Sequence, residues 1–405
     1  MTGSPGPSPG SAAVGSAAVG SSLTRSSACG PTTNLPTAPP RTRLASLTSL
    51  RAVAALLVFG FHVNLAPLAA LTAQGRLGVS FFFVLSGMLL GLSWTSGTSA
   101  RTFWRRRAAR LYPAYLVAML AGLVVSHVLG TELGRPGADV LALLLVQSWV
   151  PDARVYYVWN PVAWSLSTEA FFYLLFPLLA PLVLRLRTGA TRGLRLACVG
   201  VVVALGTWAS LALPTTFAQP NSVTAWAVYV APISRLPEFV LGLTLVAAVR
   251  GRRVPVPRWV AAIVVLAAYL VAGLDPTGLG IAAVTVVPIA VLLVVSAQAD
   301  AAGERSVLHN PALVLAGEAS YCFYLVHHLV IRLIGHLLPA GAPPGTGPAL
   351  CLVVSAGLAW LLHTRVEVPL ERRLGGRHAA ARRRSESPAQ EGPAHGDRRA
   401  VEHAR

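Results

Sequence analysis

The stretch Arg51-AVAALLVFGF-His62 places an arginine and a histidine at the two ends of ten apolar or small residues. It lies in a longer apolar run, residues 44–69, which is long enough to be a transmembrane helix. Ionisable side chains are costly inside a membrane and are therefore functional candidates by default. At about 1.5 Å per residue, the step from Arg51 to His62 is roughly 16 Å. The stretch therefore predicts that Arg51 lies near one membrane face and His62 more than halfway across.

The composition of the whole chain agrees with a membrane protein that crosses the bilayer several times. Of its 405 residues, 54% are hydrophobic and 12% are charged, which is about half the charged fraction of a typical soluble domain. The formal charge of +18 comes from arginines that cluster between the apolar runs. That placement is typical of the positive-inside bias and of contact with anionic lipid, and it argues against nucleic acid as a partner.

The four cysteines show no CxxC spacing, and Cys198, Cys322 and Cys351 lie in apolar runs. We expect these three to be small packing residues rather than a disulfide set or a metal site. The prediction for metals is therefore that none is bound.

Ten apolar runs are predicted to cross the membrane: residues 44–69, 77–95, 110–130, 160–184, 195–213, 225–249, 257–274, 279–297, 312–338 and 347–369. A shorter run at 138–150 is predicted to be interfacial or re-entrant. If it crossed, the arginines between 185 and 195 would fall outside, against the positive-inside bias. We therefore expect an all-α polytopic protein of the inner (cytoplasmic) membrane, with about ten transmembrane helices and both termini in the cytoplasm.

Two polar tails flank the predicted membrane domain of residues 44–370. Residues 1–43 are rich in Gly, Ser, Pro, Ala and Thr, and residues 371–405 are polar and basic. Such compositions cannot bury enough apolar surface to fold and favour disorder. We expect neither tail to carry chemistry.

With this topology, several ionisable residues are predicted to share a layer in the outer half of the membrane with His62. They are Glu169, Arg235, Glu238, His327 and His328. A neutral histidine can act as a general base toward a hydroxyl, and a carboxylate can orient it. We therefore expect His62 to be the base and Glu169 to orient it, with a fixed salt bridge from Glu169 to Arg235 as the alternative.

The remaining residues of this layer allow two interpretations each. Arg235 and Glu238 are three residues apart and share a helix face, so they form either an internal ion pair or a substrate contact. His327 is either functional or a core histidine. His328 points elsewhere on the helix and is predicted to be a packing residue.

A second layer is predicted on the cytoplasmic side. Arg107 and Arg110 are three residues apart on a predicted helix and would join Arg51 to form a basic layer. Arginine forks bind phosphate oxygens in bidentate fashion, so this layer predicts a phosphate site. The alternative is topology signalling with lipid headgroups. Ser86 lies in a segment of small residues that favours close helix packing and can bond to backbone or ligand.

Seven segments of the chain resemble the integral-membrane acyltransferase 3 family, in the order of that family. They are residues 50–62 with the Arg-x10-His motif, GVSFFFVLSG (78–87), RRRAARLYPAY (105–115), WSLSTEAFFYLLFPLL (164–179), ISRLPEFVLG (233–242), GEASYCFYLVHH (317–328) and VEVPLERRL (366–374). Each motif alone is weak, and the ordered set is specific. The sequences of the second and third segments are most similar to those of actinobacterial members, including macrolide O-acyltransferases.

The resemblance implies an O-acyltransferase that acts on hydroxyls of sugars, glycans or natural products. It implies that Arg51 and His62 are essential and that Arg107 and Arg110 lie near acyl-CoA. It matches Glu169 to the family's acidic position and His327 to its later histidine. Acyl-CoA, by default acetyl-CoA, would be a co-substrate with no bound cofactor, and the partners would be a hydroxyl-bearing acceptor and membrane lipids. Further candidates for supporting or substrate-binding roles are Ser86, Arg235, Glu238, Tyr115 and Trp164.

These observations lead to a mechanistic hypothesis with two rivals. His62 takes the proton of an acceptor hydroxyl as it attacks the thioester, Glu169 orients His62, and Arg235 or Ser86 stabilises the oxyanion. A covalent acyl-histidine is an alternative route. The rival classes are a proton-coupled transporter of a small polar or anionic substrate and a lipid-binding scaffold. No internal repeat relates the two halves, which disfavours the transporter, and a scaffold does not explain the buried charges.

Overall fold

The computed structural model describes residues 44–63, 72–131, 134–212, 223–274, 281–339 and 341–375. Within these ranges the protein is helical and has no β-strand, as predicted. The expectations for residues 1–43 and 376–405 lie outside the described residues. The last helix runs to Gly375, five residues beyond the boundary at residue 370, which stays a prediction.

The helices are α1 (Ala45–Val63), α3 (Leu77–Ser93), α4 (Ala100–Val128), α5 (Ala138–Leu143), α6 (Ala153–Tyr156), α7 (Trp164–Leu184), α8 (Thr188–Ala212), α9 (Val223–Ala225), α10 (Pro232–Arg250), α11 (Arg258–Ala272), α12 (Ile281–Ala301), α13 (Pro311–Glu318), α14 (Ser320–Leu337), α15 (Thr346–Leu362) and α16 (Val368–Gly375). Short 3-10 turns are η1 (Gln147–Trp149), η2 (Pro161–Ala163) and η5 (Val307–His309), and π-helical turns are η4 (Trp226–Val230) and η6 (His363–Glu367).

Seven helical stretches within the described residues are long and apolar enough to cross a membrane. They contain α1, α4, α7, α8, α10, α12 and α15. The pair α13 and α14 passes the same test as one span bent by 68°. Helices α3 and α11 are apolar but have only 17 and 15 residues. Each of the ten predicted runs thus contains a helix, while the number ten and the sides of the termini stay predictions.

The run at 138–150 does not form a spanning helix. It consists of the six-residue α5 and the three-residue η1, separated by Leu145 in the left-handed region at φ 58°. A leucine rarely adopts this conformation, which ends the helix. The buried side chains of Gln147 and Ser148 bond to the start of α7, through the carbonyls of Ala163 (3.3 Å) and Trp164 (2.6 Å).

Close packing of α3 against α10 is the most extensive helix contact. A Cβ atom on Gly87 would lie 2.0 Å from the carbonyl oxygen of Phe239, and one on Gly242 would lie 2.0 Å from that of Val84. Only glycine fits at both positions. The small residues predicted to let helices approach closely are therefore confirmed in that role.

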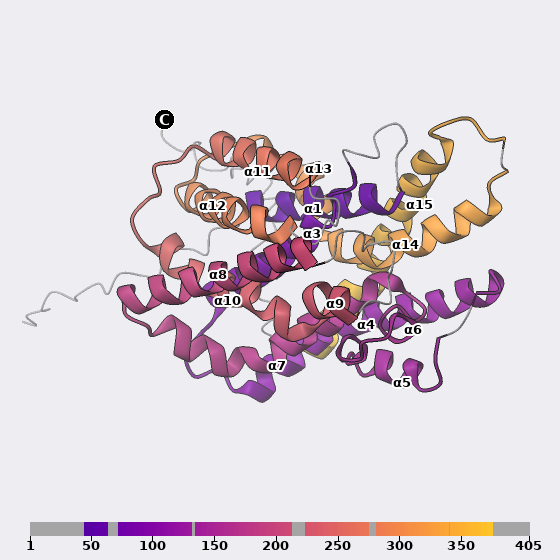
Figure 1. Cartoon of the computed structure of the whole chain (residues 1–405), viewed down its shortest axis with the longest axis horizontal. Coiled ribbons are helices and arrows are strands. Elements are labelled where there is room, and N and C mark those ends of the chain that lie inside the picture. The colour runs from indigo at the N-terminus through magenta and orange to yellow at the C-terminus, as the bar shows by residue number, and fades with distance from the viewer. Residues whose placement is uncertain are drawn as a thin grey trace, which may run out of the picture. The chain divides into compact units, whose positions relative to one another are not determined.

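Five helices converge where the candidate site lies. Helix α1 packs against α3, α13 and α14, and α4 packs against α14 and α7. Figure 1 shows α14 and α15 side by side, with α1 between them and α12. Arg51 and His62 both belong to the single helix α1, as their spacing predicted.

Candidate functional site

A cavity of about 150 Å³ lies among α1, α3, α4, α7 and α14. We call it the arginine cavity, and it is lined by Arg51, Val79, Phe82, Phe83, Leu85, Ser86, Leu89, Leu90, Arg107, Arg110, Leu111, Ser165, Leu166, Glu169, Tyr173, Ser320, Tyr321 and Tyr324. An engineered cavity of about 150 Å³ in another protein holds one benzene ring. The arginine cavity therefore has room for part of a large ligand, such as one end of an extended coenzyme.

Three guanidinium groups meet at this cavity. Arg51 comes from α1, and Arg107 and Arg110 come from α4, where a spacing of three puts them on one face. Arg51 and Arg110 form no hydrogen bond or close ion pair with any residue in the described ranges. Such cations can take the oxygens of a bound phosphate or carboxylate. The predicted gathering of these three residues is confirmed.

Glu169 faces the arginine cavity and not His62, which corrects the predicted outer layer. Its Oε1 accepts hydrogen bonds from Ser86 Oγ (3.1 Å) and Tyr173 Oη (2.5 Å). No hydrogen bond joins it to His62 or Arg235 in the part of the chain that the structure describes. The count assumed a helix that starts at the end of the apolar run, but α7 begins at Trp164, after a fully buried turn at Asn160.

The partner of His62 is His327. His327 Nε2 lies 3.2 Å from His62 Nδ1, which also lies 2.9 Å from the carbonyl of Val58. His327 Nδ1 lies 2.8 Å from the carbonyl of Tyr324. One proton assignment satisfies these contacts: each Nδ1 carries a proton, and the proton on His62 Nδ1 is shared between the Val58 carbonyl and His327 Nε2. His62 Nε2 then holds a lone pair, as a general base requires.

His328 also faces His62, which corrects its interpretation as a residue pointing elsewhere. The two rings meet edge to face with their centroids 4.9 Å apart. The bend between α13 and α14 at Ala319 sets the direction in which α14 presents these side chains. A prediction that treats residues 312–338 as one straight helix therefore gives a different direction for these side chains.

The histidine pair adjoins the arginine cavity through Tyr324. The Tyr324 ring lines the cavity, and its carbonyl binds His327. Its hydroxyl lies 2.8 Å from Ser165 Oγ, another lining group. Neither His62 nor His327 lines the cavity itself. A ligand that fills the cavity would therefore approach the histidines at its Tyr324 end.

Arg235 and Glu238 form the internal ion pair that was one of the two predicted alternatives. Arg235 Nη2 lies 3.2 Å from Glu238 Oε2 and donates to Ser80 Oγ at 3.0 Å. The guanidinium also lies 5.5 Å from the ring centre of Phe83 and 5.4 Å from that of Tyr229. Because both charged side chains are buried outside the cavity, the predicted role of Arg235 at the oxyanion is not supported.

Tyr115 and Trp164 support the bundle rather than line the cavity. Tyr115 is fully buried and donates to the carbonyl of Ala142 at 2.6 Å. Trp164 packs against Tyr229, with ring centroids 4.9 Å apart. Both residues pack the irregular segment before α7 against the neighbouring helices.

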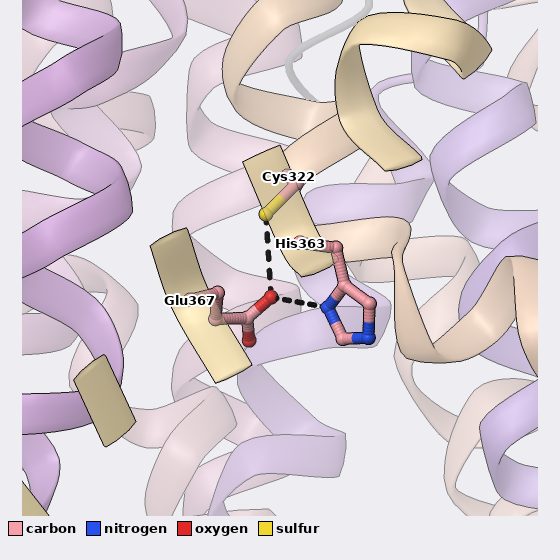
Figure 2. Close-up of side chains that lie close together, drawn as sticks. All are labelled: Cys322, His363 and Glu367. Carbon is pink, nitrogen blue, oxygen red and sulfur yellow. Dashed lines mark hydrogen bonds and ion pairs between the residues drawn. The ribbon is translucent and has the colours of Figure 1, made fainter. Parts of the chain in front are cut away.

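A buried group near Arg110 was not identified from the sequence. Figure 2 shows Glu367 between Cys322 and His363, with one carboxylate oxygen meeting both. Cys322 Sγ donates to Glu367 Oε2 at 3.2 Å, and His363 Nδ1 lies 2.6 Å from the same atom. His363 and Glu367 lie in the turn η6 and are four residues apart, a spacing that puts both side chains on one helix face.

These three side chains are ones that could hold a metal, because their ligand atoms lie within 4.8 Å of one another. Thiolate, imidazole and carboxylate are ligands that zinc accepts. However, all three are already joined by hydrogen bonds, and Arg110 interacts electrostatically with Glu367. This arrangement favours a hydrogen-bonded carboxylate that balances the charge of Arg110.

Sequence reasoning also missed the hydroxyl groups of the arginine cavity. They belong to Ser165, Tyr173, Ser320, Tyr321 and Tyr324. A signal existed for Tyr173, which follows Glu169 by one helical turn. Tyr321 and Tyr324 lie in the same segment as His327.

Comparison with known proteins gives consistent matches. A model of an acyltransferase domain matches residues 44–364. Acyltransferase MdmB from Streptomyces mycarofaciens is 37% identical over 375 residues, which cover 85% of this chain and 96% of that protein. O-acetyltransferase OatA from Staphylococcus aureus (strain NCTC 8325 / PS 47) is 32% identical over 157 residues, which cover 35% of this chain and 25% of OatA. No solved structure matches the chain.

Proposed function

Because the chain belongs to the acyltransferase 3 family, we propose that it transfers an acyl group from cytoplasmic acyl-CoA to a hydroxyl of a sugar, glycan or natural product. The family and the apolar helices make it a multi-pass membrane acyltransferase, and the inner membrane is the location we propose. The observation that carries the proposal is the meeting of three guanidiniums in a cavity that adjoins the His62–His327 pair.

The donor side rests on the arginine cavity. Coenzyme A carries several phosphates, and one arginine guanidinium can donate two parallel hydrogen bonds to phosphate oxygens. Arg51 and Arg110, which make no hydrogen bond or close ion pair with other described residues, would bind these phosphates together with Arg107. The pantetheine arm would lie in the cavity and bring the thioester toward Tyr324 and the histidines.

The chemical step follows from the proton assignment of the histidine pair. His62 Nε2 takes the proton of the acceptor hydroxyl while the oxygen attacks the thioester carbonyl. The carbon–sulfur bond then breaks, and the departing thiolate receives the proton from His62. His327 is a positioning residue in this scheme, because its Nε2 accepts from His62 Nδ1 and keeps the lone pair on His62 Nε2.

Glu169 has a different role from the one predicted from the sequence. It would hold the hydroxyls of Ser86 and Tyr173 at the cavity wall, where they face the bound donor. Ser86 donates its single hydroxyl proton to Glu169, so the predicted donation to the developing oxyanion requires this hydroxyl to rotate away from the carboxylate. In the alternative route, His62 attacks the thioester directly and forms an acyl-histidine, with the same geometry. Trapping of labelled protein distinguishes this route from general-base catalysis.

The relatives support the finer points of the proposal. The printed name of the staphylococcal relative is an O-acetyltransferase, which favours acetyl transfer to oxygen. The Streptomyces acyltransferase aligns along 96% of its length, which favours the actinobacterial subgroup that includes macrolide O-acyltransferases. We therefore propose acetyl-CoA as donor and a natural-product hydroxyl, such as that of a macrolide, among the first acceptors to test.

The test uses membranes from a host that expresses the chain, with acetyl-labelled acetyl-CoA and an extract of a macrolide producer. Wild type and His62→Ala are compared at matched expression. We expect label in an alkali-labile product with wild type alone. Equal labelling by both proteins would remove His62 from the chemistry. Proton-coupled flux of a small anion without any labelling would instead establish the transporter.

A further inference from the structure

A second cavity of about 190 Å³ lies among α4, α6 and α14. It is lined by Ser126, Thr131, Gly134, Ala153, Arg154, Tyr157, Val158, Trp159, Pro161 and Arg332. No residue of α1, α3 or α7 contributes to it, and it shares no lining residue with the arginine cavity. The function proposed above does not use it.

The two cavities lie at opposite ends of the two helices that they share. On α4, Arg110 lines the arginine cavity and Ser126 lines the second one, a separation of about 24 Å along a helix axis. On α14, Tyr324 lines the first and Arg332 the second. The catalytic histidine pair therefore lies between the two cavities, because His327 falls between these positions on α14.

The second cavity lies one helical turn of α14 away from His328. Arg332 follows His328 by four residues, so both side chains lie on one face of α14, about 6 Å apart along the axis. His328 in turn contacts His62 ring to ring, with centroids 4.9 Å apart. The amide of Asn160 donates to the carbonyl of Leu325 at 2.9 Å, which fixes the cavity wall at residues 157–161 against α14.

Polar groups in this cavity are held in place before any ligand binds. Arg332 Nη2 donates to Thr131 Oγ1 at 2.8 Å, and Nη1 donates to Ser126 Oγ at 3.3 Å and to the carbonyl of Trp159 at 3.4 Å. A guanidinium fixed by neutral oxygens presents its remaining hydrogens with little loss of conformational entropy. Such a group suits the hydroxyl oxygens of a neutral ligand.

Tyr157 and Trp159 are the aromatic residues of the lining. Trp159 has φ 58°, in the left-handed region where a non-glycine residue is strained, and such strain clusters at ligand sites. Tyr157 lies beside it in the cavity wall. A pyranose ring offers an apolar face of C–H groups to an aromatic ring and hydroxyls around its rim. A cavity of about 150 Å³ holds a benzene ring in another protein, so the second cavity has room for one six-membered sugar ring.

We propose that the second cavity binds the acceptor of the transfer reaction as a saccharide ring, stacked on Trp159 and hydrogen-bonded to Arg332. The inference rests on the proposed function. Donor and acceptor then approach His62 from opposite ends of α4 and α14. The sugar hydroxyl gives its proton to His62 Nε2 as its oxygen bonds to the acyl carbon, the carbon–sulfur bond of the thioester breaks, and the coenzyme A thiolate takes the proton from His62. With the predicted orientation of the chain, the acceptor enters from the outer face of the membrane.

The test is saturation-transfer-difference NMR on the full chain in nanodiscs, with a panel of methyl pyranosides as probes. Three variants are compared with wild type: Arg332→Ala, Trp159→Gly and the control Arg135→Ala. Trp159→Gly removes the ring at a position where glycine relieves the backbone strain, so this variant is expected to fold. Arg135 pairs with Asp152 at 2.8 Å on the same side of the protein and does not line the cavity.

We expect wild type and Arg135→Ala to bind a pyranoside alike, and Arg332→Ala and Trp159→Gly to bind it at least about tenfold more weakly. Coenzyme A binding, titrated separately, should be unchanged in all four proteins. Pyranoside affinity that is equal in all four would overturn the proposal. A wild type that binds coenzyme A but no pyranoside would also overturn it while leaving the proposed function intact. A wild type that does not bind coenzyme A would refute the proposed donor instead.

Discussion

Replacing Arg110 by alanine should weaken the use of acetyl-CoA and should spare a donor that has no phosphates. The guanidinium lines the arginine cavity and makes no hydrogen bond or close ion pair with any described residue, so its loss breaks no hydrogen bond, although Glu367 loses one electrostatic partner. A hydrogen bond between charged groups contributes about 1.5–3 kcal/mol. The expected fall in kcat/KM for acetyl-CoA is therefore about 10- to 150-fold.

The assay compares two donors, acetyl-CoA and S-acetylpantetheine, with purified protein and one acceptor. S-acetylpantetheine keeps the thioester and the arm but lacks every phosphate. Arg110→Ala should lower kcat/KM for acetyl-CoA and leave that for S-acetylpantetheine within about twofold. Arg105→Ala is the matched control, since Arg105 is an exposed arginine of the same helix that does not line the cavity. An equal loss with both donors would refute phosphate binding by Arg110.

Three further predictions follow from the packing of the site. Arg235→Ala should destabilise the protein by about 3–5 kcal/mol because it leaves Glu238 charged and buried, whereas the double variant with Glu238→Met should recover part of this loss in thermal unfolding. Gly242→Ala should lower the melting temperature, since its Cβ would lie 2.0 Å from the carbonyl oxygen of Val84; an unchanged temperature would contradict the close approach of α3 and α10. His327→Ala should lower kcat more than tenfold with little change in the KM for acetyl-CoA, and His327→Gln should restore part of kcat because its amide oxygen can accept from His62.

The sequence predicted those parts of the site that depend on local spacing. Arg107 and Arg110 share a helix face at any depth in the membrane. Arg51 joins them if its helix begins on the same side of the membrane. His62 and His327 were expected at one depth, and they lie in hydrogen-bond contact at 3.2 Å. Arg51 and His62 lie on the continuous helix α1, and Arg107 and Arg110 lie on the continuous helix α4. His327 was counted across the bend before α14 and still meets His62.

Where the chain breaks, counting along it failed. Glu169 was placed beside His62, but α7 starts at a buried turn, so Glu169 faces Ser86 instead. His328 was predicted to be a packing residue, but the 68° bend before α14 turns it toward His62. A hydropathy pattern marks neither a bend nor a buried helix start, because both keep the apolar run intact.

The choice between alternatives also required three-dimensional information. The spacing of Arg235 and Glu238 fits an internal ion pair and a substrate contact equally well, and the burial of both residues outside the cavity decides for the ion pair. Cys322 and Glu367 lie 45 residues apart and belong to different helical segments, α14 and η6. Periodicity at 3.6 residues per turn contains no information about such a contact.

The most direct test of the central claim is a cryo-EM structure of the protein with S-ethyl-coenzyme A, a thioether that cannot transfer its ethyl group. The account predicts phosphate density within hydrogen-bond distance of at least two of Arg51, Arg107 and Arg110, and the sulfur atom at the Tyr324 end of the arginine cavity, next to His62. Phosphates bound elsewhere, or a sulfur atom separated from His62 by the intact cavity wall, would contradict it.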